Sequence, residues 1–266
     1  MSRDGPPVLP ANLGAADWRP LDGGDTSASW RVRLDDGRDV VVKQGPHPAE
    51  WEAEGLGALA DAGVPVPEVV AAEANVLVIA HVAGTPHWEG LGAALAAAHR
   101  RRGEAFGWHR DNAVGLAAQR NSPDADWASF YGEQRVRPHL DAPALPADLR
   151  RRLQSALDGQ LQSLLDHDPA PSLVHGDLWA GNIVDGAWLI DPSVHHADRE
   201  YDLAFATVFG GIPAAFFAGY EDEWPLPDGS QRRRPALQLH HLLVHVRLFG
   251  DGYVGTVAAR LDALGW

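Results

Sequence analysis

Three oxygen-bearing side chains lie at spacings that suit the transfer of a phosphoryl group. Asp177 and Asn182 are five residues apart within the segment 173–182, and Asp191 follows at the end of an apolar run. Phosphoryl transfer from a nucleotide needs a carboxylate that meets the acceptor hydroxyl, and oxygen ligands for the metal that bridges the phosphates. We therefore predict Asp177 as the catalytic base, and Asn182 with Asp191 as ligands of Mg²⁺, which favours oxygen donors.

A short hairpin would bring the two metal ligands together. The segments 183–184 and 188–190 are typical of short strands, and a strong tight-turn signal, Asp-Gly, lies between them at 185–186. The reversal of the chain predicts that Asn182 and Asp191 lie at the same end of the hairpin, within reach of one cation. For the tripeptide His-Gly-Asp alone an ordinary turn is the simpler interpretation, but the complete set of groups favours a catalytic site.

A cation for the nucleotide phosphates is expected at Lys43. This lysine closes the apolar strand 39–43, and Glu52 in the following helix could pair with it. Glu50 and Glu54 are rivals for that pairing, and a solvated lysine at a strand end is the alternative interpretation. Together with the Asp177 set, the pattern favours a phosphate-binding lysine.

A loop for the phosphates is a weaker prediction. The segment 23–29 contains glycines and small hydroxyl residues that could turn backbone N–H groups toward phosphate oxygens, with Gly24 and Ser27 as candidate contacts. The segment matches neither G-x-G-x-x-G nor the Walker A pattern. A plain loop is an equally good interpretation.

The elements that must position these residues predict a two-lobed α+β fold. The first part of the chain indicates a small antiparallel β-sheet with one helix, from strands at 30–34, 39–43, 68–72 and 76–80 and a helix at 48–62. The second part indicates a larger, mainly helical lobe, from helices at 91–102, 126–137, 146–165 and 235–249. Only the span 173–191 is predicted to form strands there. We expect a nucleotide-binding lobe at 1–81 and a catalytic and substrate-binding lobe at 82–266.

Composition limits the classes of partner. With 45% hydrophobic and 22% charged residues among 266, a packed globular core is expected. The net charge of -14 makes nucleic acid and anionic membranes poor partners. No cysteine is present, so disulfides, a thiol nucleophile and cysteine-based zinc sites are excluded. The sequence shows no apolar stretch of about 20 residues and no signal-peptide pattern, which predicts a cytoplasmic protein.

Histidines and arginine runs invite hypotheses that we discount. His241 and His245 have the i, i+4 spacing of two metal ligands on one helix face, but they lie in a segment with an apolar stripe, which favours structural roles. The three Arg-Arg-Arg runs are explained by helix ends and solvated faces better than by nucleic-acid binding.

Taken together, the motifs resemble the fructosamine kinase (ketosamine kinase) family. That family belongs to the aminoglycoside-phosphotransferase branch of the protein-kinase-like fold. The residues that carry the resemblance are H-G-D-L-W-x-G-N at 175–182, I-D-P at 190–192 and D-R-E-x-D-L-A at 198–204, with further matches that cover nearly the whole chain from residue 23. The resemblance implies ATP and Mg²⁺ as cofactors. It also implies a ketosamine substrate, the adduct formed when a reducing sugar glycates an amine, and hence a role in deglycation.

The family motif assigns roles to individual residues. It implies Asp177 as the base, Asn182 and Asp191 as metal ligands, and Lys43 with Glu52 as the groups that position the phosphates. On the acceptor side the resemblance implies contacts from Trp179, His195, Asp198, Arg199 and Glu200. Trp179 could stack on a sugar ring, and core packing is an equally good interpretation of this residue.

Two departures from the family pattern bear on binding. Residues 80–82 stand where many relatives carry a glutamate at the interlobe hinge, so adenine would be bound there by backbone groups at Ala80 and Val82. His195-His196 stands where tyrosines are frequent, near the expected acceptor pocket, so substrate preference could differ.

The function expected first is an ATP-dependent ketosamine kinase, acting on small ketosamines and, as a further option, on glycated protein side chains. One alternative is a kinase for another small hydroxyl compound, such as an aminoglycoside, choline or a sugar. The other is an inactive nucleotide-binding pseudokinase, which the presence of Lys43, Asp177, Asn182 and Asp191 disfavours. The sequence leaves the oligomeric state open.

Overall fold

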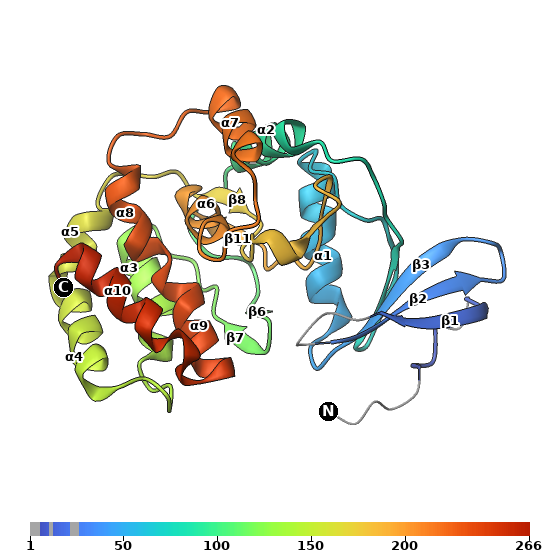
Figure 1. Cartoon of the computed structure of the whole chain (residues 1–266), viewed down its shortest axis with the longest axis horizontal. Helices are drawn as coiled ribbons and strands as arrows, with labels where there is room; N and C mark the ends of the chain where they lie inside the picture. Colours follow the sequence, from blue (N-terminus) through green and yellow to red (C-terminus); the bar gives the residue numbers. More distant parts are fainter. Residues whose placement is uncertain (1–5, 11–12, 22–26) are drawn as a thin grey trace.

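The structure is a computed structural model of the chain, and it describes residues 6–10, 13–21 and 27–266. Of the expected phosphate loop, Gly24 and its neighbours at 22–26 lie outside the described residues, whereas Ser27 lies within them. Figure 1 shows a sheet at one end of the molecule, helices at the other end, and α1 between them.

The N-terminal part is a five-stranded antiparallel sheet in the order β1-β2-β3-β5-β4. The strands are β1 (Ala15–Leu21), β2 (Ala28–Leu34), β3 (Asp39–Gln44), β4 (Val69–Glu73) and β5 (Val76–Ala80). Alternate residues of β2 and β3 are buried on one face, which is the two-residue period expected of strands. These strands confirm the four predicted from the sequence. The fifth, β1, escaped prediction because it is a mostly exposed edge strand that contains Pro20, and prolines are tolerated at sheet edges.

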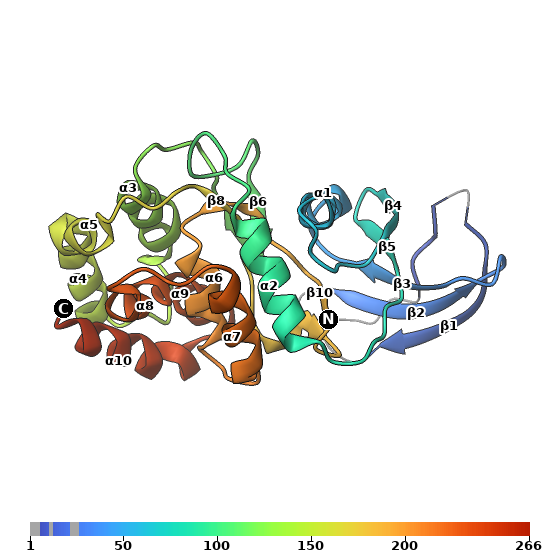
Figure 2. The ribbon, with the colours of Figure 1, turned by 90° about the horizontal axis from the view of Figure 1, so that it is seen from above.

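Helix α1 (Ala49–Asp61) joins the sheet to the rest of the molecule. It begins directly after Pro48, as predicted, because the fixed φ of proline suits a helix start. Leu56 and Leu59 pack in one buried cluster with Leu77 of β5 and with Leu95 of the second part of the chain. Figure 2 shows α1 lying between the sheet and α2 (Trp88–His99). The helix therefore fixes the sheet relative to the helical part.

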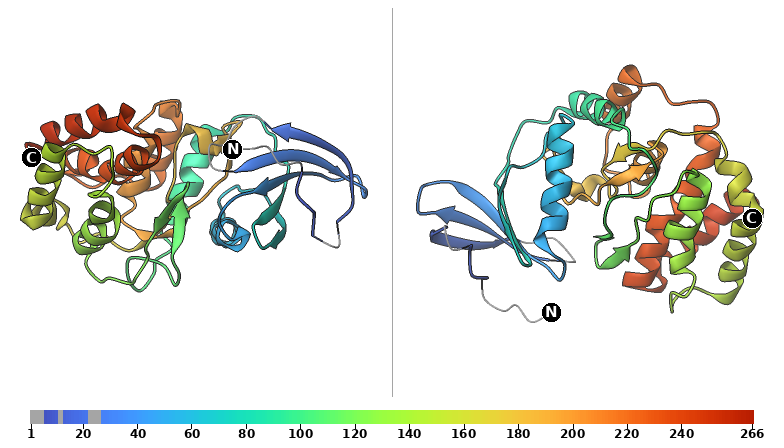
Figure 3. Two further views of the ribbon diagram at one scale, coloured as in Figure 1. Left: turned by 90° about the horizontal axis from the view of Figure 1, so that it is seen from below. Right: turned by 180° about the vertical axis from the view of Figure 1, so that it is seen from behind.

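The C-terminal part is mainly helical, and Figure 3 shows its helices gathered at the end away from the sheet. After α2 its helices are α3 (Trp127–Tyr131), α4 (Ala147–Ser155), α5 (Leu161–Leu165), α6 (Glu200–Ala206), α7 (Ala214–Glu223), α8 (Ser230–Leu237), α9 (Leu239–Phe249) and α10 (Val254–Leu264). Three short strand pairs accompany them: β6 (Asn112–Val114) with β7 (Ala117–Gln119), β8 (Ser172–Val174) with β11 (His195–Ala197), and β9 (Ile183–Val184) with β10 (Trp188–Leu189). No helix in the described part of the chain combines the length and the apolarity that a membrane crossing requires.

Some predictions for this part were wrong in detail. Strands β6, β7 and β11 lie outside the predicted span 173–191. The sequence did not predict them because strands of three residues are too short to show a pattern. The segment 146–165 is interrupted at Gly159, whose φ of 158° is not helical. The last predicted helix does not begin at Pro235, which lies inside α8, and a second helix, α9, follows.

Candidate active site

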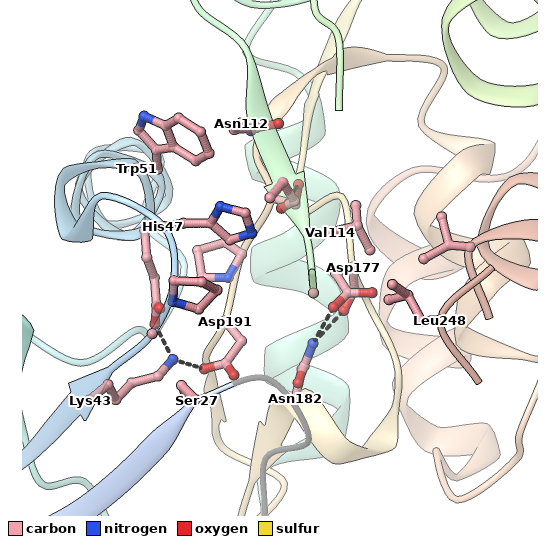
Figure 4. Close-up of a pocket in the computed structure, with 18 of the residues that line it drawn as sticks. Ser27, Lys43, His47, Trp51, Asn112, Val114, Asp177, Asn182, Asp191 and Leu248 are labelled. Atoms are coloured by element: carbon pink, nitrogen blue, oxygen red, sulfur yellow. Dashed lines mark hydrogen bonds and ion pairs between the residues drawn. The ribbon is translucent and has the colours of Figure 1, made fainter. Parts of the chain in front are cut away.

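The predicted base and metal ligands meet in one cleft. The cleft is lined on one side by β3 and α1, and on the other by the β6–β7 turn, the segment 177–193 and α9. Figure 4 shows Lys43 and Asp191 on one side of it, with Asn182 and Asp177 beside them. The sequence-predicted residues Lys43, Glu52, Asp177, Asn182 and Asp191 all line this cleft.

The hairpin between the two metal ligands forms as predicted. Strands β9 and β10 pair antiparallel, and Asp185 and Gly186 in the turn have φ of 52° and 64°, the left-handed conformation that Asp and Gly tolerate. The Ile190 N–H donates to the Asn182 carbonyl at 3.0 Å, which closes the base of the hairpin. Asp191 itself has a φ of 56°, a conformation that costs on the order of 1 kcal/mol outside glycine. Such strain is typical of residues held in place for function.

Lys43 is fixed by two carboxylates. Its Nζ lies 2.6 Å from Glu52 Oε1 and 2.6 Å from Asp191 Oδ1. Burial opposes the charge on the lysine, but the two carboxylates outweigh it and raise the pKa of Lys43 above its ordinary value. Burial, assisted by Asp191, raises the pKa of Glu52 to about 7 against the opposing effect of Lys43. The lysine therefore stays charged and pointed into the cleft.

The structure distinguishes Glu52 from its two rivals. Glu50 and Glu54 both bind Arg110, at 2.7 and 3.2 Å. Trp108 Nε1 also donates to Glu54, at 2.8 Å. Of the three glutamates, only Glu52 pairs with Lys43 in the described part of the chain.

Asp177 lies beside Asn182 at the floor of the cleft. The Asn182 Nδ2 donates to the Asp177 carbonyl at 2.8 Å and to its Oδ2 at 3.1 Å. Burial raises the pKa of Asp177 to about 7, against the opposing effect of the Asn182 hydrogen bond, and the charge of Asp191 adds to the rise. A carboxyl group that titrates near neutral pH suits a general base.

Two oxygens remain for a cation. Asn182 uses its side-chain nitrogen for Asp177, and Asp191 uses Oδ1 for Lys43. The second side-chain oxygen of each residue is Asn182 Oδ1 and Asp191 Oδ2, and the Asp191 carboxylate also acts on Glu52. An amide oxygen and a carboxylate oxygen beside a charged lysine fit Mg²⁺, which takes one or two protein oxygens and completes its shell with phosphate and water.

Asp202 holds the catalytic loop from behind. This fully buried carboxylate of α6 accepts the backbone N–H of His175 at 2.7 Å and of Gly176 at 2.9 Å. His99 Nε2 lies 3.2 Å from the same group. Burial opposes the charge, but the hydrogen bonds and nearby charges lower the pKa of Asp202. The sequence motif contained Asp202 without a role for it; its signal was an acid beside the apolar residues 203–206 of α6.

Gly176 can only be glycine here. Its φ is +85°, and a Cβ would lie 2.0 Å from the Ser193 carbonyl oxygen. His241 of α9 completes the support of this residue, because its Nε2 hydrogen-bonds the Gly176 carbonyl at 2.9 Å. The His241 ring stacks on Phe205, with ring centres 3.7 Å apart, and its Nε2 lies 4.0 Å from Asp177 Oδ1. Burial lowers the pKa of His241 to about 3, so the ring is neutral and its Nε2–H can donate.

Replacing His241 should therefore slow turnover through the catalytic loop. His241→Phe keeps the stack on Phe205 but loses the bond to Gly176, so we expect kcat to fall about tenfold, the effect of one hydrogen bond. His241→Gln retains a donor and should recover most of the activity. Steady-state kinetics with the melting temperature as a control would measure this, and a Phe variant with wild-type kcat would contradict it.

Four predicted acceptor contacts lie away from the cleft, which corrects the expectation that they face the substrate. His195 is fully buried, its Nδ1 bonds the Ser193 carbonyl at 3.0 Å, and β11 carries it into the helical core. Asp198, Arg199 and Glu200 line a different cavity. They start α6 and fix its surroundings: Asp198 bonds His167, Arg199 donates to the carbonyls of Trp224 and Pro225, and Glu200 pairs with Arg233.

The remaining predicted contacts differ in position. Trp179 lines the cleft, and its ring fills the space beside Gly181 and meets Phe209 edge-on at 5.9 Å. Ser27 lines the opposite side. Ala80 is the last residue of β5, and its backbone N–H donates a hydrogen bond to the Glu68 carbonyl at 2.8 Å. Neither Ala80 nor Val82 is among the lining residues of this cleft, so their contact with adenine stays a prediction.

Several residues of the cleft were not predicted as site residues. They come from the Pro-His-Pro segment before α1, from α1 itself, the β6–β7 turn, the segment after α6 and the α9 region, which are far apart in sequence. They include His47, Trp51, Val114, Phe209, Leu248, Phe249 and Tyr253.

Comparison with known proteins identifies the family of the chain. The family model described as fructosamine kinase matches residues 10–264. A probable ketoamine kinase of Thermus thermophilus is 38% identical over 252 residues, covering 92% of each chain. Another, of Lactiplantibacillus plantarum, is 33% identical over 256 residues, covering 88% of this chain and 89% of that one.

Solved structures show the same relationship. A crystal structure of a candidate fructosamine-3-kinase from Thermobifida fusca superposes with a TM-score of 0.86 at 35% identity, over 94% of this chain and 93% of that one. An ADP-bound aminoglycoside phosphotransferase superposes with a TM-score of 0.57 at 14% identity, over 94% and 93%, which shows the shared fold alone. The chain therefore belongs to the fructosamine kinase family, phosphotransferases with the protein-kinase-like fold.

Proposed function

We propose that this protein transfers the γ-phosphoryl group of ATP to a sugar hydroxyl of a ketosamine of the fructosamine or ribulosamine type. The observation that carries the proposal is the convergence of Lys43, Asp177, Asn182 and Asp191 in one cleft of a chain of this family. Small ketosamines are the proposed acceptors, and glycated protein side chains are a further class for the same chemistry.

In the proposed reaction the acceptor hydroxyl lies against Asp177. Its oxygen forms the new bond to the γ-phosphorus while the bond from that phosphorus to the β–γ bridging oxygen of ATP breaks. The hydroxyl proton passes to the Asp177 carboxylate, and ADP leaves with the bridging oxygen. Lys43 binds the phosphates as a fixed cation. Asn182 and Asp191 would hold Mg²⁺, which when bound neutralises charge on the phosphate oxygens.

The two parts of the fold divide the work. Residues 1–81 would bind the nucleotide, with Ser27 and Gly24 near the phosphates and the backbone at Ala80 and Val82 near adenine. Residues 82–266 would supply the catalytic loop and the acceptor side, where Trp179 lines the cleft. The segment between β5 and α2 would be the hinge.

A turnover panel tests the proposal. Purified protein with ATP and Mg²⁺ should consume ATP when given a ribulosamine or a fructosamine, with the phosphorylated adduct identified by mass spectrometry. Aminoglycosides, choline and the free sugars serve as competing acceptors. Turnover of an aminoglycoside with none of any ketosamine would replace the proposal by that alternative. Absence of turnover with every acceptor, together with ATP binding, would indicate an inactive nucleotide-binding protein.

Loss of Asp191 should weaken nucleotide binding that depends on metal. Asp191→Ala removes one of the two proposed protein ligands, so the affinity for ATP in the presence of Mg²⁺ should fall at least about tenfold. Even the loss of a residue that only hydrogen-bonds a metal ligand typically lowers metal affinity by about tenfold or more. Calorimetric titration of ATP at several Mg²⁺ concentrations measures the effect. Glu50→Ala, on the same side of the molecule but paired with Arg110, is the control. An unchanged response to Mg²⁺ in Asp191→Ala would remove this residue from the metal site.

A further inference from the structure

The acceptor half of the cleft is an aromatic surface. We call Trp179, Phe209, Phe249 and Tyr253 the acceptor wall. Phe209 meets Trp179 at 5.9 Å and Tyr253 at 6.1 Å between ring centres, and Tyr253 meets Phe249 at 6.2 Å. All four side chains line the same cleft as Asp177. The wall therefore continues directly from the proposed catalytic base.

Two members of the acceptor wall are unusually exposed. Phe209 is 41% exposed and Phe249 is 47% exposed, and within the described residues only three other large hydrophobic side chains are exposed. Those three, Val8, Leu21 and Leu116, are not among the residues that line the cleft. Clustered exposed aromatic rings in a concave site indicate a surface that binds an apolar group.

The position of the wall indicates which part of a ketosamine it meets. In Figure 4, Lys43 and Asp191 lie to one side of Asp177, and Leu248, on the helix that carries Phe249, lies to the other. The phosphates belong with Lys43, and the sugar hydroxyl belongs with Asp177. What remains of the ketosamine beyond its sugar is the amine-derived substituent, which would extend along the wall.

The charges of the cleft limit that substituent further. Among the described lining residues the only lysine or arginine is Lys43, and it is bound to Glu52 and Asp191. Three carboxylates, those of Glu52, Asp177 and Asp191, face the cleft. The histidines of the lining are His47 and His245. The three carboxylates would repel a carboxylate on the acceptor, whereas the ammonium group of a ketosamine is attracted to carboxylates and to aromatic faces.

We propose that the acceptor wall binds the amine-derived substituent of the ketosamine and selects apolar or aromatic amines against amines that carry a carboxylate. The inference rests on the proposed function. It predicts that ketosamines formed from amines with an uncharged substituent, such as aralkyl amines, are better substrates than ketosamines formed from free α-amino acids.

Three adducts of one sugar test the inference. Ribulose is attached to methylamine, to benzylamine and to glycine, and kcat/KM is measured for each at saturating ATP and Mg²⁺. The benzylamine adduct should exceed the methylamine adduct by about tenfold, because an apolar group enters the wall. The glycine adduct should fall below the methylamine adduct by about tenfold, because the carboxylates of the cleft repel its carboxylate.

A variant ties the preference to the wall. In Phe249→Ala the benzylamine-to-methylamine ratio of kcat/KM should fall at least threefold, with the change in KM rather than kcat. Val8→Ala, which removes an exposed apolar side chain outside the cleft, should keep the wild-type ratio. A ratio that Phe249→Ala leaves unchanged would overturn the role of the wall.

The outcomes separate this inference from the proposed function. Turnover of all three adducts with equal kcat/KM, or a preference for the glycine adduct, would overturn the inference and leave the ketosamine kinase activity intact. No turnover of any adduct, including the small methylamine one, would instead overturn the proposed function on which the inference rests.

Discussion

Asp177→Asn is expected to lower kcat by about three orders of magnitude, within the range found for loss of a general base. The substitution preserves the size of the side chain but removes the group that accepts the hydroxyl proton. Because Asp177 makes no contact with Lys43 in the described structure, the affinity for ATP should change less than about threefold. A change confined to kcat would show that the contact between the Asp177 carboxylate and the acceptor hydroxyl acts in the transition state.

Single-turnover kinetics with a ketosamine, together with calorimetric binding of ATP, would measure both quantities. Asp61→Asn is a matched control, since it makes the same chemical change on an exposed residue at the end of α1. An Asp177→Asn protein with wild-type kcat would show that the base lies elsewhere. A large loss of ATP affinity would show that Asp177 belongs to the nucleotide site.

Sequence predicted those parts of the site whose signals are local. The Asp-Gly turn at 185–186 determines the β9–β10 hairpin, and that hairpin alone brings Asn182 and Asp191 to one end. The alternation in β2 and β3 and the proline before α1 are likewise encoded within a few residues. The pairing of Lys43 with Glu52 could be predicted from these signals, because β3 and α1, which carry the two residues, are consecutive elements.

Tertiary packing decided what local signals could not. His195 follows Asp191 by four residues, yet β11 pairs with β8 and carries it into the core rather than toward the cleft. Arg199 lies on a cavity with Trp224, which no local pattern connects to it. The acceptor wall joins Phe209 to Tyr253 through the arrangement of α6 and α9, and its members share no periodicity in the sequence.

Several histidines that the fold buries in neutral form weaken the folded state at mildly acid pH. Burial is the main cause that lowers the pKa of each of them, to about 4 for His139 and about 3 for His241. The same cause lowers the pKa of three more, namely His175, His195 and His240. All five are buried in the helical part or in the catalytic loop.

The sign of the effect follows from linkage. The folded-state pKa of these histidines lies below the unfolded value of about 6.5, so the unfolded chain takes up the protons first as pH falls. His139 and His241, with pKa values of about 4 and about 3, therefore each cost about 1.4 kcal/mol of stability one pH unit below 6.5, and the other three histidines act in the same direction. Four groups with raised pKa values act in the opposite direction, because they take up protons first in the folded state as pH falls: Glu52 and Asp177, both at about 7, Glu200 and His167.

We expect the melting temperature of His139→Gln to fall less than that of the wild type between pH 7.5 and pH 5.5, by about 3–6 °C, given the usual dependence of melting temperature on stability for a chain of this size. Differential scanning calorimetry in buffers of constant ionic strength measures it. His139→Gln should lower the slope of stability against pH by about one proton, since it removes one of the five groups. His87→Gln, at an exposed histidine, should retain the wild-type slope. A His139→Gln protein with the wild-type slope would mean that the His139 ring is already charged or accessible in the folded protein.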